Sequence, residues 1–446
     1  MDMDLRGKNI AVIGLAKTGL ATTAFLLHRG ARVIATDEKP VSPLKDDLRA
    51  ARIVPHDPAI LKGVELVIPS PGAPPSNPIL MEAVRQGIPV LSEIELASRF
   101  LKPPMIAITG TNGKTTTTAL IGHILAESGK KAFVGGNIGA PLIGYVDGPQ
   151  EDDYAVIEVS SFQLQWIESF HPAVAILLNV TSDHLDYHGS FDGYRLAKER
   201  IFANQTARDV AILNADDPGT EGLQQRLAAG ILRFSSTRAV SPGIYIDGSR
   251  LVYAPSPLER EGYPLDMVKI RGRHNVENVM AALMAVRSCG CDPLAVIAAV
   301  ETFPGKAHRI EFVGEYRGVS FYDDSKGTNV DAVYRALETF SKPVVLLMGG
   351  RDKEGDFKTL IPALKEKVKH LILFGEARDT IGSIIGGIVV THLCPTLKDG
   401  IETAITAAAP EDVILLSPGC ASFDEFRDYK ARGQFFKDRV KALSHD

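Results

Sequence analysis

The sequence predicts an α/β protein built from three domains. Short apolar segments alternate with helical segments along most of the 446 residues, which is typical of parallel sheets covered by helices. Glycine-containing turns follow several of the apolar segments, and ligands of open α/β sheets bind at such strand ends. Proline-rich segments at 101–104 and 303–305 predict domain bounds of 1–100, 101–306 and 307–446.

The first domain is predicted to be Rossmann-like. Residues 8–13 form a strand, 14–19 a glycine turn, 20–29 a helix and 32–36 a second strand. The dinucleotide fingerprint G-x-G-x-x-G lacks its middle glycine, because Ala16 stands there. Asp37 could still accept a hydrogen bond from a ribose or a base. Loop chemistry alone explains these turns, including Ser70–Gly72 after a third strand at 66–68, about as well as a ligand does.

Residues 105–120 carry the motif around which the chain is organised. The apolar run 105–108 leads into Gly110–Thr115, G-x-x-G-K-T, and then into a helix. A glycine turn at a helix N-terminus presents backbone N–H groups and positive potential to a phosphate. Lys114 would reach the phosphates, and the Thr115 hydroxyl would bind Mg²⁺. The order of strand, glycines, Lys-Thr and helix favours a P-loop ATPase-type domain over a glycine turn followed by an exposed lysine.

Three further side chains of the central domain invite a chemical interpretation. Glu158 lies in an apolar strand, 154–159, where a carboxylate is costly unless it is paired or bound to a metal. His184 follows the strand 173–180 and could bind a metal or a phosphate, although a single histidine there is more often a capping or packing residue. Lys198 lies in a helical segment, 194–202, whose spacing favours a solvated basic face.

The remainder of the chain predicts a hairpin and a second open sheet. Residues 243–254 form the hairpin, and Asn275 either caps a helix at 276–288 or contacts a nucleotide. Residues 310–322 form an antiparallel pair, and four strands follow in a C-terminal Rossmann-like α/β domain, at 344–347, 371–374, 389–392 and 413–416.

Composition excludes several classes of protein. The formal net charge is −5 with both signs interspersed, which gives no nucleic-acid footprint. No apolar run approaches the roughly 18 residues of a membrane span, and the acidic start MDMD is unlike a secretory signal. A cytoplasmic protein is expected. The four cysteines are expected to be reduced thiols that form neither a disulfide framework nor a zinc site.

Together these residues resemble the Mur ligase family of peptidoglycan synthesis over essentially the whole chain. Gly110–Thr115 matches the short phosphate loop of that family, which accounts for Ile108 where the general motif has glycine. The segment Leu416–Phe426, LSPGCASFDEF, is most similar to the members that add D-glutamate. The Asp-Asn-Pro-Arg motif of the diaminopimelate-adding members is absent.

The resemblance implies roles for individual residues. Lys114, His184 and Lys198 would be catalytic, and Lys198 would carry a carbamate, whose oxygens can bind Mg²⁺ as an ammonium cannot. The implied magnesium ligands are Thr115, Glu158, His184 and the carbamate of Lys198. The implied ATP-binding residues are Gly110, Thr111, Asn112, Gly113, Lys114, Thr115, Thr116, Asn275, His308, Arg309 and Asp324. The implied contacts to a uridine-nucleotide substrate are Leu15, Thr18, Asp37, Ser70, Pro71, Gly72, Asn137 and His184. Those to D-glutamate are Lys326, Thr328, Lys353, Ser422, Phe423 and Tyr429, where the family has phenylalanine at the last position.

The resemblance also implies substrates and a reaction. ATP and two Mg²⁺ ions would serve the ligation of D-glutamate to UDP-N-acetylmuramoyl-L-alanine through an acyl phosphate, in a monomer without nucleic-acid partners. One alternative is another Mur or folylpolyglutamate-type ligase with a different amino acid. A nicotinamide dehydrogenase conflicts with the broken fingerprint at 14–19. A binding module without chemistry would bind ATP but release phosphate slowly, whatever amino acid is added.

Overall fold

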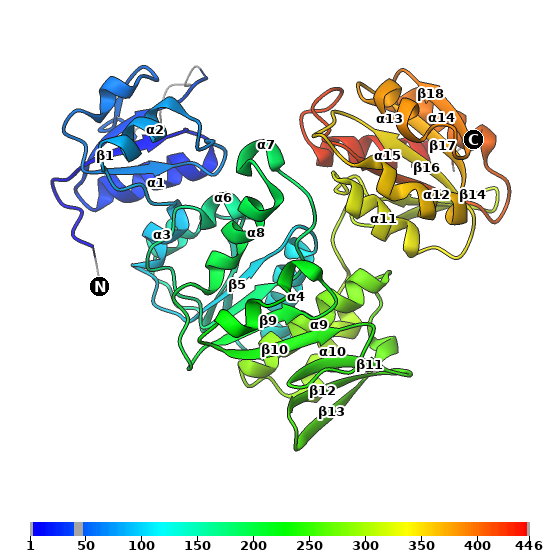
Figure 1. Ribbon diagram of the computed structural model, residues 1–446, viewed down its shortest axis with the longest axis horizontal. Helices are drawn as coiled ribbons and strands as arrows, with labels where there is room; N and C mark the ends of the chain where they lie inside the picture. Colours follow the sequence, from blue (N-terminus) through cyan, green and yellow to red (C-terminus); the bar gives the residue numbers. More distant parts are fainter. Residues whose placement is uncertain (1–2, 40–47, 444–446) are drawn as a thin grey trace. The chain divides into compact units, whose positions relative to one another are not determined.

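The described part of the chain folds into three sheets, each flanked by helices (Figure 1). The computed structural model describes residues 3–39 and 48–443. The chain divides into two compact units. Unit 1 comprises the described part of Met1–Val180 with Tyr187–Met267 and Asn278–Glu301, and unit 2 comprises Thr181–Asp186, Val268–Glu277 and the described part of Thr302–Asp446. The predicted α/β class with three sheets is confirmed, whereas the bounds 1–100, 101–306 and 307–446 stay a prediction.

The N-terminal sheet of unit 1 has four parallel strands in the order β3-β2-β1-β4. Their bounds are β1 Asn9–Ile13, β2 Arg32–Thr36, β3 Arg52–Ile53 and β4 Leu66–Pro69, and the helices are α1 Lys17–His28 and α2 Pro78–Arg85. The predicted βαβ unit is confirmed; the two-residue strand β3 was not predicted. The order of the strands reverses between β1 and β4, and ligands of open α/β sheets bind at the carboxyl ends of the strands on either side of such a reversal.

The second sheet of unit 1 has nine strands, in the order β13-β12-β11-β10-β9-β8-β5-β7-β6. The fully buried strand β5, Met105–Thr109, lies between β7 and β8 and leads into helix α4, Lys114–Glu127. The other strands are β6 Ala132–Gly136, β7 Tyr154–Glu158, β8 Val174–Leu177, β9 Val210–Asn214, β10 Gly230–Ser235, β11 Gly243–Asp247, β12 Arg250–Ser256 and β13 Glu259–Pro264. The predicted hairpin is confirmed as β11 and β12. The polar edge strand β13 was not predicted.

Seven more helices belong to the segment between β4 and the third sheet. They are α3 Glu93–Ser98, α5 Leu142–Val146, α6 Ser161–Leu164, α7 Leu185–His188, α8 Phe191–Glu199, α9 Arg273–Ser288 and α10 Pro293–Thr302. The predicted N-cap role of Asn275 is wrong, because α9 begins at Arg273. Asn275 lies in the first turn instead, where its side-chain amide donates to the carbonyl of Arg271 over 2.6 Å.

The sheet of unit 2 has six strands in the order β14-β15-β19-β16-β17-β18. The strands are β14 Glu311–Tyr316, β15 Val319–Asp323, β16 Val344–Gly349, β17 Val368–Phe374, β18 Val390–Cys394 and β19 Val413–Gly419. The helices are α11 Val330–Glu338, α12 Ile361–Lys367, α13 Arg378–Ile385, α14 Leu397–Ala407 and α15 Tyr429–Leu443. Alternate residues of β16 pack on opposite faces, Leu346 against α11 to α13 and Leu347 against α14 and α15. Both faces are therefore covered, and the predicted strands are confirmed.

Glu95 on α3 forms a buried polar link inside unit 1. Its Oε2 accepts the backbone N–H groups of Glu168, Ser169 and Phe170 at 2.8 to 3.0 Å, and its Oε1 accepts the Ser169 hydroxyl and Arg99 Nε, each at 2.7 Å. Burial raises the pKa of Glu95, but these hydrogen bonds and the Arg99 charge leave it below its usual value. We expect Glu95→Gln to lower the free energy of unfolding of unit 1 by about 2–4 kcal/mol, measured by urea unfolding.

The stabilisation by Glu95 should depend on pH. Since its pKa is lower in the folded than in the unfolded state, the stabilisation is complete above the usual pKa of a glutamate. It is lost as the pH falls through the folded-state pKa. Glu82→Gln on α2 is the control, because Glu82 bonds only to Arg85 and Gln86 on an exposed helix surface. Equal unfolding midpoints for Glu95→Gln and Glu82→Gln would contradict the prediction.

Candidate active site

The loop Gly110–Thr115 joins the carboxyl end of β5 to α4. Gly113, directly before the helix, has φ +85°, and a Cβ there would lie 2.3 Å from the side-chain oxygen of Asn278, so only glycine fits. Asn179, just after β8, holds the loop: its carbonyl and its side-chain oxygen accept the N–H groups of Thr111 and Asn112 at 2.9 and 2.8 Å. The loop is thereby fixed with the first N–H groups of α4 available to an anion.

Lys114 lies over this loop. Its Nζ donates to the carbonyl oxygens of Gly110 and Thr111 at 2.7 and 2.8 Å. Thr115 and Thr116 occupy the first turn of α4, and the Thr116 side chain is buried. The arrangement places an ammonium and the positive end of a helix at one point, which suits the β- and γ-phosphates of a nucleotide.

Glu158, the last residue of β7, is buried at 2% exposure. Its Oε2 accepts the Thr115 hydroxyl at 2.8 Å, and its Oε1 accepts the Asn137 amide at 2.9 Å. A carboxylate and a hydroxyl therefore meet at the start of α4. These oxygen ligands fit Mg²⁺ bound beside a phosphate. The structure thus brings together three of the predicted residues, Thr115, Asn137 and Glu158.

Lys198 contradicts the interpretation that its helix spacing favoured. It is 1% exposed, and its Nζ donates to Gly110 O over 2.7 Å. The same Nζ lies 4.4 Å from the centre of the Tyr194 ring, and the Tyr194 hydroxyl donates to the side chain of Thr111. The face of α8 that carries Lys198 is therefore turned to the phosphate loop and not to solvent. The spacing correctly predicted the helix but could not show which face packs inward.

The carboxyl ends of β1, β2 and β4 bring together predicted residues of the N-terminal sheet. The Asp37 carboxylate accepts the N–H of Leu15 at 2.6 Å, and this bond is the main cause that lowers the pKa of Asp37. The Ser70 hydroxyl donates to Gly14 O over 2.8 Å. Thr18 lies in the first turn of α1, and Pro71 and Gly72 follow Ser70. These groups form one rim at the strand ends between β1 and β4.

The predicted ATP residues that lie outside the loop and α4 belong to unit 2. His308 directly precedes Arg309 in the chain. The Nδ1 atom of His308 lies 2.6 Å from Oδ2 of Asp323. Asp324 is buried and accepts the Ser417 hydroxyl at 2.8 Å. Burial raises the pKa of Asp324 to about 7, although the Ser417 bond and the Arg309 charge act in the opposite direction. A nearby divalent cation would stabilise its charged form.

Unit 2 also contains a cavity of about 370 Å³ at the carboxyl end of its sheet. Thr328, Lys353 and His184 are among the residues that line it. Lys353 Nζ lies 3.8 Å from Asp183 Oδ1, and the Asn329 amide donates to Asp183 Oδ2 over 3.2 Å. The segment of His184 therefore belongs to unit 2, whereas Thr115, Glu158 and Lys198 belong to unit 1.

Of the other predicted D-glutamate residues, Lys326, Ser422 and Phe423 lie on loops that follow the strands of this sheet, and Tyr429 is the first residue of α15. Lys326 Nζ is 4.2 Å from the centre of the Tyr429 ring. Ser422 is buried, whereas Phe423 is 64% exposed. The structure thus pairs Lys326 with Tyr429, and it brings Thr328 and Lys353 to the same cavity.

Three residues outside the predicted set also shape these sites. Asn179 holds the phosphate loop through hydrogen bonds, Asn278 packs against Gly113, and Arg432 is fully buried at the strand ends of unit 2. Arg432 lies on the apolar stripe of α15, four and eight residues before Phe436 and Val440. A charged residue on an apolar helix stripe is the signal that could have identified it.

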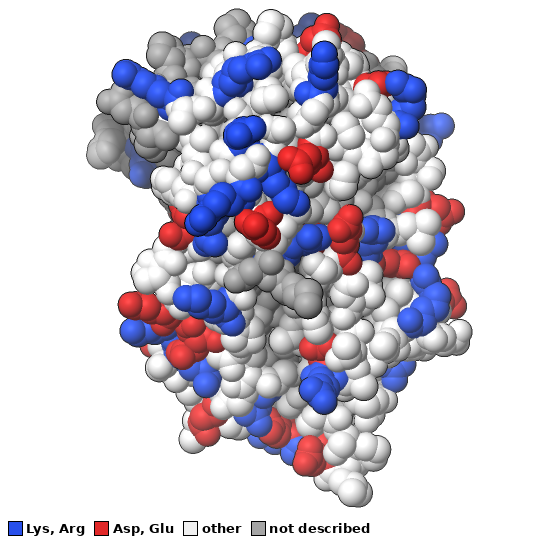
Figure 2. Space-filling view, turned by 90° about the vertical axis from the view of Figure 1, so that its left-hand side faces the viewer, with Lys and Arg blue, Asp and Glu red and all other residues white. Residues whose placement is uncertain are grey.

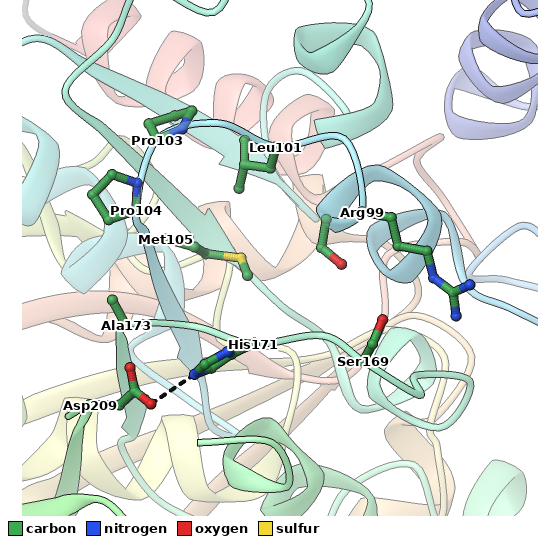
Figure 3. Close-up of a pocket in the computed structure, with 10 residues that line it drawn as sticks. Arg99, Leu101, Pro103, Pro104, Met105, Ser169, His171, Ala173 and Asp209 are labelled. Atoms are coloured by element: carbon green, nitrogen blue, oxygen red, sulfur yellow. Dashed lines mark hydrogen bonds and ion pairs between the residues drawn. The ribbon is translucent and has the colours of Figure 1, made fainter. Parts of the chain in front are cut away.

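A larger cavity, of about 600 Å³, lies in unit 1 at the end of the nine-stranded sheet that is opposite to the phosphate loop (Figure 3). It is lined by Arg99, Met105, His171 and Asp209 among others, and His171 Nε2 lies 2.7 Å from Asp209 Oδ2. Met105 is the first residue of β5, so this cavity is at the amino end of the strand. Among the described residues that line it, none is a predicted site residue, and ligands of such sheets bind at the carboxyl ends.

The surface adds two broader observations. Lysine and arginine are interspersed with aspartate and glutamate over the face that Figure 2 shows, in agreement with the small net charge of −5. Within residues 3–39 and 48–443, no helix has the length and apolarity required to cross a membrane.

Comparisons with known proteins cover nearly the whole chain. Three family models match it: the Mur ligase MurD-like N-terminal domain at residues 8–92, the Mur ligase middle domain at 108–286 and the Mur ligase glutamate ligase domain at 308–420. The UDP-N-acetylmuramoylalanine--D-glutamate ligase of Syntrophus aciditrophicus is 56% identical over 450 residues, and that of Geobacter metallireducens is 45% identical over 448, each covering 99% of both chains.

Solved structures agree on the fold. A pseudomurein peptide ligase type C from Methanothermus fervidus has a TM-score of 0.62 at 18% identity, over 97% of this chain and 100% of that one. A MurF ligase from Thermotoga maritima in complex with ADP has a TM-score of 0.61 at 17% identity, over 98% and 96% of the two chains.

Proposed function

Because this chain belongs to the Mur ligase family, we propose that it joins D-glutamate to UDP-N-acetylmuramoyl-L-alanine with consumption of ATP, in peptidoglycan precursor synthesis. The observation that carries the proposal is the 56% identity, over 99% of both chains, to a ligase named for this reaction. The phosphate loop at β5, with Lys114, Glu158 and Lys198 around it, supplies a matching site for ATP.

The proposed reaction has two steps. The carboxylate of UDP-N-acetylmuramoyl-L-alanine attacks the γ-phosphorus of ATP, the bond from that phosphorus to the bridging oxygen breaks, and ADP leaves. The D-glutamate amine, after losing a proton, attacks the acyl carbon of the acyl phosphate, and phosphate leaves as the amide forms. Phosphoryl transfer depends mainly on positioning and on neutralising charge, and the Lys114 ammonium and the α4 N-terminus serve both needs in this proposal.

The proposal includes two Mg²⁺ ions. Thr115, Glu158, His184 and a carbamate on Lys198 would hold them, and the buried Thr115–Glu158 pair supports this assignment because both side chains offer oxygen ligands. When bound, the ions would neutralise phosphate charge and orient the oxygens of the reacting groups. Asn137 keeps Glu158 oriented through its amide.

Glu158→Gln should raise the Mg²⁺ concentration that gives half-maximal activity by about tenfold or more. The change keeps the size of the side chain and one oxygen acceptor but removes the negative charge next to Thr115. The measurement is phosphate release over a range of Mg²⁺ at saturating substrates. Glu151→Gln is the matched control, because Glu151 is exposed and precedes the same strand, β7. An unchanged Mg²⁺ dependence in Glu158→Gln would remove Glu158 from the metal site.

The position of D-glutamate is also part of the proposal. The cavity of unit 2, with Lys353 and Thr328 on its wall and Lys326 at Tyr429 nearby, offers cations and a hydroxyl to an amino acid with two carboxylates. The uridine nucleotide is assigned to the rim of Leu15, Asp37 and Ser70 in the N-terminal sheet. We further propose a cytoplasmic monomer, for which light scattering should give a mass near 48.1 kDa.

Transfer of labelled oxygen tests the acyl phosphate. With ¹⁸O in the carboxylate of UDP-N-acetylmuramoyl-L-alanine, one labelled oxygen should appear in the released phosphate for each amide formed, because that oxygen attacks the γ-phosphorus. Phosphate without label would contradict the proposed route. The alternative, another Mur or folylpolyglutamate-type ligase, predicts the same labelling with a different amino acid, and the identity of the added amino acid in the product separates the two.

A further inference from the structure

Among the described residues of unit 2, Arg432 is the largest side chain that is completely buried, with an exposure of 0%. It lies one turn into α15, on the stripe that also carries Phe436 and Val440. A buried guanidinium is costly unless its N–H groups are satisfied. The hydrogen-bond partners of Arg432 therefore indicate which parts of the fold this side chain holds together.

Arg432 is hydrogen-bonded to the ends of three neighbouring strands. Its Nε donates to the Ser325 hydroxyl at 3.0 Å, and its Nη2 donates to the carbonyls of Ser325 and Cys420 at 3.0 and 3.1 Å. Its Nη1 lies 3.3 Å from Ala421 O and 3.5 Å from Gly349 O. The planar fork of one arginine thus connects the carboxyl ends of β15, β19 and β16, which are adjacent in the sheet.

The loops that leave these three strand ends carry the residues assigned to D-glutamate. Lys326 and Thr328 follow β15, Lys353 follows β16, and Ser422 and Phe423 follow β19. A fourth segment is attached through Ser325, whose hydroxyl donates to the carbonyl of Tyr429 at 2.9 Å. Every chain segment that contributes an assigned D-glutamate residue is therefore within one or two hydrogen bonds of the Arg432 guanidinium.

Among the described residues, no carboxylate contacts the Arg432 guanidinium directly. The hydrogen bonds that the structure gives it end on backbone carbonyls and one hydroxyl. Burial lowers the pKa of Arg432 to about 10, against the effects of more distant acids such as Asp424 and Asp323, so the group stays protonated at neutral pH. A buried cation at this edge favours the binding of anions beside it.

We propose that Arg432 is a positioning residue for D-glutamate: it fixes the loops after β15, β16 and β19 at one spacing and adds positive potential where the two carboxylates of the amino acid bind. This inference rests on the proposed function. Errors of about 1 Å in such positioning can cost on the order of 100-fold. The effect should fall on D-glutamate and spare ATP and the uridine nucleotide.

Two variants test the two parts of this role. Arg432→Lys keeps the charge but loses the fork, and Ser325→Ala removes the hydroxyl that joins Arg432 to Tyr429. We expect the KM for D-glutamate to rise about tenfold or more in Arg432→Lys and about threefold in Ser325→Ala. The KM values for ATP and for UDP-N-acetylmuramoyl-L-alanine should stay within about twofold of the wild type. Arg427→Met is the matched control, since the Arg427 side chain is 86% exposed.

The outcomes separate a positioning role from a purely structural one. Ser325→Ala removes one hydrogen bond to the start of α15 but leaves Arg432, Phe436 and Val440 unchanged, and it keeps the test decisive if Arg432→Lys fails to fold. A rise of all three KM values together, or a lower thermal midpoint with unchanged KM for D-glutamate, would overturn the inference. If the wild-type protein itself released no phosphate in response to D-glutamate, the proposed function would fail. If the wild type depended on D-glutamate but Ser325→Ala and Arg432→Lys left the KM for D-glutamate unchanged, only the role of Arg432 would be refuted.

Discussion

Lys114→Ala should lower D-glutamate-dependent phosphate release by about 10³-fold or more. The ammonium lies over the loop Gly110–Thr115, 2.7 and 2.8 Å from two of its carbonyl oxygens, where the γ-phosphate is proposed to react. A charged side chain that stabilises a transferring phosphoryl group is typically worth about 10³–10⁵-fold in kcat, and the first N–H groups of α4 lack the charge to replace it. The measurement is kcat for phosphate release with all three substrates saturating.

The control for this variant is Lys131→Ala. Lys131 is exposed and precedes β6 of the same sheet, so its loss should leave kcat within about twofold. Substantial ligation by Lys114→Ala, above about a tenth of the wild-type rate, would mean that Lys114 does not contact the reacting phosphate.

Lys198→Ala should lower kcat by about 100-fold or more and should recover activity when a short carboxylic acid such as acetate or formate is added. The reason is the proposed carbamate, which forms when the neutral amine adds to CO₂ and loses a proton. Alanine removes the carrier and leaves a space at Gly110 that a small carboxylate can fill with similar oxygen ligands. The measurement is phosphate release against acid concentration at constant ionic strength.

A second variant separates this rescue from a general salt effect. Lys114→Ala lacks the ammonium that donates to Gly110 and Thr111, and a carboxylate cannot replace a cation, so acids should not restore it. If acids fail to restore Lys198→Ala, or restore both variants equally, the carbamate has no support and Lys198 acts as an ammonium.

Local pattern predicted the strands and the phosphate loop well because each depends on adjacent residues. The apolar run 105–108, the glycines and Lys-Thr produce β5, the loop and α4 with little influence from the remainder of the chain. The strand β13 was missed because its sequence, EREGYP, is polar and it pairs only at the edge of the sheet. The start of α9 was missed because Asn275 resembles a cap but lies inside the first turn.

Tertiary packing determines the burial and the contacts of residues whose environment the local sequence pattern cannot predict. Helical spacing favoured a solvent-exposed position for Lys198, whereas in the structure Lys198 is buried against Gly110 and Tyr194. The resemblance to the Mur ligases identified Lys198 when spacing alone could not. Arg432 was missed by both, since its role depends on three strand ends that meet only in the folded sheet.

The most direct test of the proposed function is the amino-acid dependence of phosphate release. ATP, Mg²⁺ and UDP-N-acetylmuramoyl-L-alanine are combined with D-glutamate, L-glutamate, L-alanine, L-lysine or diaminopimelate, and phosphate and product mass are followed together. We expect release with D-glutamate alone, and a product heavier by one glutamyl residue. Release with another amino acid, or release that is indifferent to all of them, would contradict the assignment of D-glutamate to this ligase.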